Sequence, residues 1–142
     1  MNKIYIEVIR EEIVVFEGVP CARGKITIGD FDERFGIALE YWTLEDYKRQ
    51  WRDGLERINT HDKSCFVTYV QDPEKSPFLN WWNLYKVGNK IIIRNQILFA
   101  HLYSNKIGDK RFTPNNCYDF LDERIMPEPD EPMPAEWIID LE

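Results

Sequence analysis

The chain has few of the residues from which catalytic and metal centres are usually built. It holds three cysteines, Cys21, Cys65 and Cys117, and only two histidines, His61 and His101. Because no Cys-x-x-Cys pair is present, we expect neither a zinc site nor a disulfide framework, and we interpret the cysteines as reduced, buried apolar residues. A Gly-rich phosphate loop, Gly-x-Ser-x-Gly and His-Glu-x-x-His are also missing. These absences predict a protein with no catalytic residues, no metal and no cofactor.

Long apolar runs are missing too. None approaches the roughly 18 residues of a membrane span, and the opening MNKIYIEVIREE is interrupted by charge too early for a signal peptide. We therefore expect a cytoplasmic chain with no membrane partner. With 142 residues, of which 44% are hydrophobic, the sequence predicts a single domain over 1–142 with a substantial core.

The charge is concentrated at one end of the chain. Residues 119–142 contain nine acids against one base, Arg124, so this stretch has a net charge of −8. The whole chain has a net charge of −7, so the first 118 residues are close to neutral. Direct nucleic-acid binding is disfavoured, because phosphate neutralisation needs clustered Lys and Arg. An acidic segment on a near-neutral body suits a basic partner, although a solvated tail that aids solubility is an equally simple interpretation.

Hydrophobic periodicity predicts an α+β fold: a mainly antiparallel β-sheet with one amphipathic helix packed on a face. The helix is expected over about 44–58, because apolar residues recur every three or four positions there and Thr43 with Asp46 forms a capping box. Trp42 and Tyr47 have the spacing of a hydrophobic staple. Strands are expected at 3–9 and 12–16, joined by a turn at Arg10-Glu11, at 25–31 leading into a strand that ends near Trp42, at 65–71 and after Glu136.

Residues 80–99 predict a β-hairpin around a Gly88-Asn89 turn, in which positions summing to 177 face each other. Trp82, Leu84, Ile91, Ile93 and Ile97 then share the core face. The opposite face mixes amides with Trp81, Tyr85 and Arg94, and Asn83 lies opposite Arg94. That composition is typical of an interface patch, and the alternative is a covered face with its polar groups paired internally.

Two features follow the hairpin. Thr113-Pro114 resembles a helix start, which predicts a short helix near 115–123. The Pro-rich acidic stretch 126–134 holds four of the eight prolines and is expected to be an extended connector. A final edge strand anchored by Trp137 and Ile139 is expected to follow it.

Several blocks together resemble the immunity proteins of bacterial contact-dependent growth inhibition (CDI). They are GDFDERF at 29–35, YWTLEDYKRQWRDGLERI at 41–58, KSCFVTYVQDP at 63–73, NWWNLY at 80–85, NQILF at 95–99 and a closing Glu-Trp at 136–137. The resemblance covers roughly residues 28–141, and the first 25 or so residues match least. It implies a cytoplasmic protein that neutralises the C-terminal toxin domain of a CDI adhesin, commonly a basic nuclease, by stoichiometric binding.

The toxin-binding residues are hypotheses from charge and face composition. The first group is acidic and the second lies in the hairpin: Asp119, Asp122, Glu123, Glu128, Asp130 and Glu131, then Trp81, Tyr85 and Arg94. Two alternatives stay open at this point. One is a module that binds a small ligand on the aromatic face, and the other is a hydrolase that holds a metal through Asp30 with Asp32 or Glu33.

Overall fold

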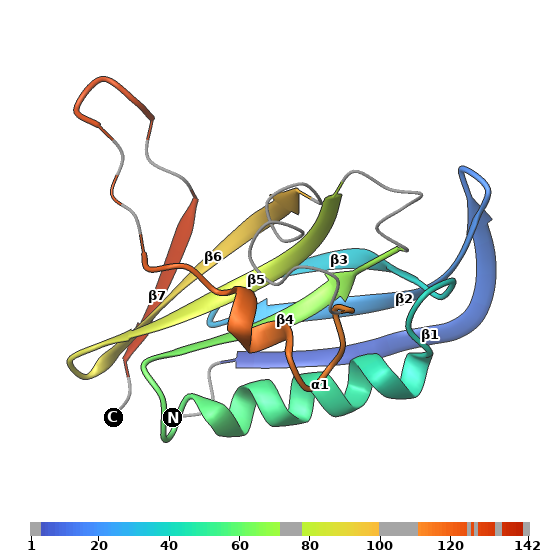
Figure 1. Ribbon diagram of the computed structural model, residues 1–142, viewed down its shortest axis with the longest axis horizontal. Helices are drawn as coiled ribbons and strands as arrows, with labels where there is room; N and C mark the ends of the chain where they lie inside the picture. Colours follow the sequence, from blue (N-terminus) through green and yellow to red (C-terminus); the bar gives the residue numbers. More distant parts are fainter. Residues whose placement is uncertain are drawn as a thin grey trace.

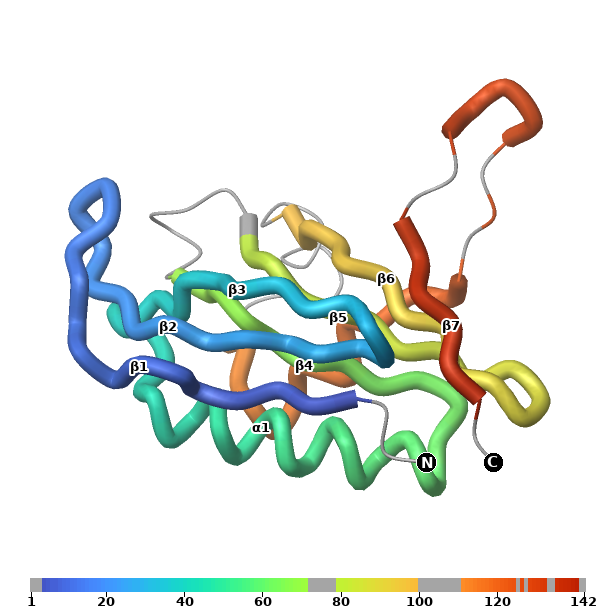
Figure 2. The backbone as a smooth tube through the Cα atoms, turned by 180° about the vertical axis from the view of Figure 1, so that it is seen from behind, coloured from blue at the N-terminus to red at the C-terminus, as the bar shows by residue number. Residues whose placement is uncertain are grey.

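The computed structural model describes residues 4–71, 78–99, 111–124, 126, 128–132 and 135–140, which form two antiparallel sheets, one helix and a short 3-10 helix. One sheet has the strand order β1 (Ile4–Phe16), β2 (Val19–Ile28) and β3 (Phe31–Ala38). The other has the order β4 (Lys63–Tyr69), β5 (Phe78–Val87), β6 (Lys90–Phe99) and β7 (Glu136–Asp140). Figures 1 and 2 show the smaller sheet lying over one face of the larger. The α+β class with antiparallel strands is confirmed, and the division into two sheets is new.

The core fills the space between the sheets. Ile26 and Ile37 from the smaller sheet join Trp82, Leu84 and Ile93 from the larger in one cluster, and all five are almost fully buried. Alternate residues of a strand face opposite sides, so this cluster occupies the face of β5 and β6 that the sequence predicts as core. Ile97 is the exception on that face. It is 51% exposed, and its prediction as a core residue was wrong.

The N-terminal strands are longer than expected and differently divided. The strands predicted at 3–9 and 12–16 form a single strand, β1, which crosses Arg10-Glu11 with register shifts against β2 on either side of Arg10. Gly29, whose φ is +59°, makes a turn between β2 and β3, inside the stretch that we predicted as one strand. β3 ends at Ala38 rather than near Trp42. Register shifts within β1 and the glycine turn at Gly29 explain the first two differences.

Helix α1 (Leu44–Arg57) begins where its capping box predicts. The Thr43 hydroxyl accepts from the Asp46 amide at 3.1 Å, and the Asp46 carboxylate accepts from the Thr43 amide at 2.9 Å. The rings of Trp42 and Tyr47 lie 5.1 Å apart, as the staple spacing predicts. Leu55 belongs to the apolar residues that recur every three or four positions along the helix, and it is nevertheless 44% exposed.

α1 covers the edge of the larger sheet at β4. The Gln50 amide donates to the Cys65 carbonyl at 2.8 Å and accepts from the Val67 amide at 2.7 Å, and the Trp51 indole donates to the Val67 carbonyl at 2.7 Å. These side chains satisfy backbone groups of β4 that no neighbouring strand reaches. Gly54 permits the close approach, because a Cβ there would lie 2.3 Å from the Cys65 carbonyl oxygen.

Residues 111–124 lie across the outer face of the larger sheet, the face turned away from the smaller sheet. The Trp42 indole donates to the Phe112 carbonyl at 3.1 Å, and the Phe112 ring lies 6.0 Å from that of Trp81 and 5.0 Å from that of Phe120. The helix predicted near 115–123 is a 3-10 helix, η1 (Cys117–Phe120). Further on, residues 128–132 lie away from both sheets (Figures 1 and 2), and residues 127, 133 and 134 of the predicted connector are outside the described residues.

All three cysteines are free and buried, as predicted. The Cys65 and Cys117 sulfurs lie 3.9 Å apart, which joins η1 to β4 inside the core. Burial raises the pKa of the Cys65 thiol well above its ordinary value, and the hydrogen bond with Cys117 raises it further. Such thiols are poor nucleophiles, because the thiolate is the reactive form.

Candidate functional site

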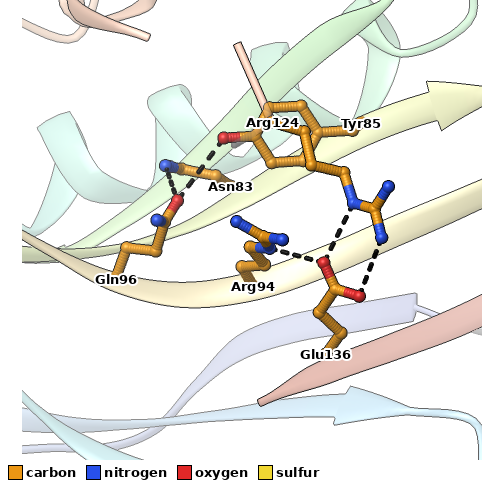
Figure 3. A network of polar contacts seen from close by, with 6 residues as sticks. All are labelled: Asn83, Tyr85, Arg94, Gln96, Arg124 and Glu136. Carbon is orange, nitrogen blue, oxygen red and sulfur yellow. Dashed lines mark hydrogen bonds and ion pairs between the residues drawn. The ribbon is translucent and has the colours of Figure 1, made fainter. Parts of the chain in front are cut away.

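The outer face of the β5–β6 hairpin carries a row of polar side chains. The register runs from Phe78 opposite Phe99 to Val87 opposite Lys90, so the predicted pairing is confirmed and Asn83 faces Arg94. The Asn83 amide donates to the Gln96 side-chain oxygen at 2.6 Å, and the Tyr85 hydroxyl is 3.4 Å from the same atom (Figure 3). Part of the amide content of this hairpin therefore serves internal pairing.

An ion-pair cluster joins β6, β7 and the acidic segment. Glu136 lies directly opposite Arg94 on the neighbouring strand and accepts from its Nε at 2.5 Å. Arg124 binds the same carboxylate in a two-pronged arrangement, through Nε and Nη2, each at 2.9 Å (Figure 3). Bidentate Arg–carboxylate pairs fix geometry as well as adding energy. Glu136 thereby holds the chain at Arg124, immediately after Asp122 and Glu123, against the sheet.

The electrostatics of the cluster follow from this geometry. Hydrogen bonding from Arg124 lowers the pKa of the Glu136 carboxyl; partial burial opposes that effect and Arg94 adds to it. The same hydrogen bond raises the pKa of Arg124. Nearby, burial raises the pKa of the Tyr85 hydroxyl, so it remains a neutral donor. Glu136 is thus ionised when its two arginine partners are charged.

The aromatic part of this face is covered. Trp81, Tyr85 and Arg94, which the sequence suggested as a recognition patch, are only 3%, 5% and 3% exposed. Phe112 packs on Trp81, and Glu136 pairs with Arg94. Of the two interpretations left open by the sequence, the structure shows the covered face, because residues 111–124 lie over it and Glu136 of β7 pairs with Arg94. A role for these three residues in partner binding stays a prediction.

The structure brings the two predicted groups of site residues together. A small cavity of about 110 Å³ is lined by Trp81, Tyr85 and Arg94 and also by Asp122 and Glu123. The six predicted acids are all exposed, and Glu123 forms a surface ion pair with Lys63 at 2.8 Å. What this side of the protein presents to solvent is therefore acidic, over a buried aromatic and arginine layer.

Of the remaining predicted acids, Asp119 lies in η1, and Glu128, Asp130 and Glu131 lie in a turn beyond the sheet. The Glu131 carboxylate accepts from the Glu128 amide at 2.8 Å, and the Glu131 amide donates to the Glu128 carbonyl at 2.9 Å. With Asp130 between them, these contacts close a compact turn whose acids are exposed. The negative charge of this turn is held in one place rather than spread along an open chain.

The geometry gives little support to the alternative sites. Ligand pockets usually enclose roughly 300–1,000 Å³, well above the cavity beside Trp81. Asp32 and Glu33 point to opposite faces of β3, so at most one of them can lie on the same side as Asp30. Among the described residues, no group of three or more His, Cys, Asp or Glu side chains could hold a metal ion. None of the helices in the described part of the chain combines the length and apolar character that a membrane crossing demands.

Comparison with known proteins places the chain in a family. The model of the CdiI N-terminal domain family matches residues 37–142. The chain belongs to that family. The curated protein "Immunity protein CdiI" of Enterobacter cloacae subsp. cloacae is 29% identical over 131 residues, which cover 92% of this chain and 86% of the relative. Among solved structures, a chain of the "CdiA-CT/CdiI toxin and immunity complex from Enterobacter cloacae" matches with a TM-score of 0.78 and 27% identity, over 97% of this chain and 90% of that chain.

The blocks that carry the CdiI resemblance are mainly scaffold. Gln50 and Trp51 bind β4, Trp82 lies in the core, and Glu136 organises the ion-pair cluster. Sequence reasoning missed the link from Arg94 to Glu136, which are 42 residues apart. The closing Glu-Trp of the resemblance was the available signal, but without the β6–β7 register it could not be assigned a contact.

Proposed function

We propose that this chain is an immunity protein that binds and neutralises the toxin domain of a CDI adhesin. The observation that carries the proposal is the match, over nearly the whole chain, to a protein named as an immunity protein and to a chain of a toxin and immunity complex. It acts stoichiometrically in the cytoplasm, without catalysis and without a cofactor. Nuclease–immunity pairs are among the tightest protein complexes known, so a stoichiometric inhibitor of this kind is physically reasonable.

The toxin is proposed to be a basic nuclease. The proposed acidic surface consists of six exposed acids between Asp119 and Glu131, three on the segment that crosses the larger sheet and three in the turn beyond it, in a chain of net charge −7. Nucleases must bind phosphate backbones and therefore carry positive surfaces. Complementary charge speeds the diffusional encounter and discourages partners of the wrong sign.

Two contacts attach the acidic segment to the larger sheet. Phe112 anchors the segment to Trp42 and Trp81, and Arg124 anchors its end to Glu136. Asp122 and Glu123 lie between these two anchors. Charges held by a folded support require less ordering when the toxin binds, which favours affinity.

Two matched variants test this assignment by changing the same number of charges in different places. The first neutralises four acids of the proposed surface: Asp122→Asn, Glu123→Gln, Glu128→Gln and Asp130→Asn. The second neutralises four exposed acids on β3 and α1: Asp32→Asn, Glu33→Gln, Asp53→Asn and Glu56→Gln. Both leave a net charge of −3, so only the location differs.

Association with the cognate toxin domain is followed by stopped flow at several salt concentrations. The first variant is expected to associate about ten-fold more slowly at low salt and to lose most of its salt dependence, whereas the second stays close to wild type. Equal losses in the two variants would refute the assignment to this surface. Failure of the wild-type chain to bind the toxin, or to protect cells that express it, would refute the function itself.

A further inference from the structure

The C-terminal end of β1 exposes four consecutive apolar residues to solvent. Ile13, Val14, Val15 and Phe16 are 59%, 50%, 67% and 62% exposed. Because neighbouring residues of a strand point to opposite sides, both faces of this half-strand are open to solvent. A strand in a folded protein normally covers at least one face, and contiguous exposed apolar surface marks contact sites.

The end of the β1–β2 hairpin that carries this apolar run is nevertheless firmly attached to the rest of the protein. Phe16 pairs with Val19 and Val14 pairs with Cys21 across the hairpin, whose turn contains Glu17 and Gly18 at positive φ. Val19 and Cys21 pack in a small second core with Ala38. Figures 1 and 2 show this end of β1 and β2 bending away from the rest of the smaller sheet. The apolar run is therefore presented in a fixed conformation, which lowers the ordering cost of binding.

The bend encloses a cavity of about 280 Å³ with a positively charged lining. Val14, Phe16 and Phe35 supply apolar walls, and Arg10, Arg23 and Arg34 lie around them with one acid, Glu12. The salt bridges found among the described residues involve none of these three arginines. A chain of net charge −7 thus has a cationic concavity at the end of the smaller sheet.

The register makes this arrangement unfavourable in the free protein. Arg10 lies directly opposite Arg23, and Lys25 lies directly opposite Arg34. Like charges in directly opposed positions destabilise a sheet. Arg10, Arg23 and Arg34 line the cavity together, so an anion that enters it would reduce the repulsion among them, and the site has a reason to prefer a carboxylate.

This end of the protein lies outside the part of the chain that the family model matches. Arg10, Arg23, Arg34 and the whole apolar run precede residue 37, where the match to the family model begins. The chain of the toxin and immunity complex nevertheless matches over 97% of this protein, so the strands themselves are shared. A surface built on shared strands can carry the contacts that discriminate between partners.

We infer that the cavity under the β1–β2 hairpin is a second contact site for the toxin, which receives an apolar side chain flanked by a carboxylate. The inference rests on the proposed function and adds a specificity site to it. The apolar side chain enters between Val14 and Phe16, and the carboxylate meets Arg23 and Arg34. The acidic surface governs encounter, whereas this site governs which toxin stays bound.

The test compares one apolar and one charge variant with matched controls. Phe16→Thr removes the exposed ring beside the hairpin turn, and Val87→Thr is its control, because Val87 is 51% exposed and also precedes a glycine turn. Arg23→Glu with Arg34→Glu reverses the cavity charge, and Arg52→Glu with Arg49→Glu on α1 makes the same change in net charge elsewhere. Thermal unfolding establishes that each variant is folded.

Binding to the toxin domain is measured by surface plasmon resonance. Phe16→Thr and the Arg23/Arg34 pair are each expected to weaken binding at least about ten-fold, mainly through faster dissociation, while both controls stay within about two-fold of wild type. Hydrogen exchange on the wild-type complex should show protection of the β1–β2 amides near Phe16. Wild-type affinity in both site variants, or unprotected hairpin amides in the complex, overturns the inference while the immunity function stands.

A second copy of the chain is the competing occupant. If the free protein is a dimer that Phe16→Thr converts to a monomer with unchanged toxin affinity, the hairpin is a self-association surface and the inference is overturned. If the wild-type chain does not bind the toxin at all, the proposed function fails first.

Discussion

Replacing Glu136 with glutamine removes the negative charge from the ion-pair cluster and keeps the side chain's length. Glu136 receives three N–H contacts from two arginines, and its side chain is 10% exposed, against 3% for Arg94 and 25% for Arg124. In the variant, the buried Arg94 cation keeps its charge beside a neutral amide. We expect a large loss of stability, because Arg94 is removed from water and loses its ion pair with Glu136.

The size of the loss follows from these exposures. Removing one partner of a buried ion pair costs about 3–5 kcal/mol. Arg124 is a quarter exposed, so water can solvate it in the variant, and we expect about 3 kcal/mol, at the lower end of that range. For a chain of this length, each kcal/mol lowers the melting temperature by about 3 °C, so a fall of about 9 °C is expected.

Asp140→Asn is the matched control. Lys90–Asp140 joins the same two strands, but its side chains are 52% and 71% exposed, and an exposed pair contributes at most about 1 kcal/mol. Urea unfolding followed by tryptophan fluorescence gives both free energies. Equal losses of unfolding free energy in the two variants would refute the argument, because they would show that the buried ion pair of Arg94 with Glu136 stabilises the protein no more than an exposed pair does.

Three further predictions follow. Hydrogen bonding from Arg124 lowers the pKa of Glu136 in the folded protein, so the stability that Glu136 contributes is complete above the ordinary carboxyl value of 4.5 and is lost as the pH falls through the lower folded value. Unfolding titrations below about pH 4.5 should therefore show the wild type losing more stability than Glu136→Gln. Parallel losses in the two proteins would contradict this. Gly54→Ala should cost about 2 kcal/mol, since its Cβ would lie 2.3 Å from the Cys65 carbonyl oxygen, whereas Gly36→Ala, whose nearest contact is at 3.9 Å, should change the free energy of unfolding by less than about 0.5 kcal/mol in the same urea assay. Iodoacetamide should modify Cys65 and Cys117 only as fast as the protein unfolds, and mass spectrometry that finds rapid labelling of the folded chain would show that the core around them opens locally.

Features that depend on neighbouring residues could be predicted from the sequence. The capping box at Thr43 fixes where α1 begins, and a two-residue turn at Gly88-Asn89 fixes the register of the hairpin. Both signals are local, so no knowledge of the rest of the fold is required. The same local reasoning failed at β1, because a bulged strand and two strands joined by a short turn have the same apolar pattern.

Features that depend on segments far apart in the chain could not be predicted from the sequence. The composition of Trp81, Tyr85 and Arg94 fits an interface and equally fits a face that another part of the chain covers. Only the docking of Phe112 and the pairing with Glu136 decide between them. The six acids were easier to place, because ionised carboxylates mostly stay at the surface.

The way α1 meets β4 has a consequence for the behaviour of the protein before it meets any target. An unpaired strand at the rim of a sheet is a template on which other chains can add, and this leads to aggregation. Here Gln50 and Trp51 already occupy those backbone groups with their side chains. The protein can therefore accumulate without the β4 edge starting aggregation. Detachment of α1 from β4 would expose this edge and would be the first step toward aggregation.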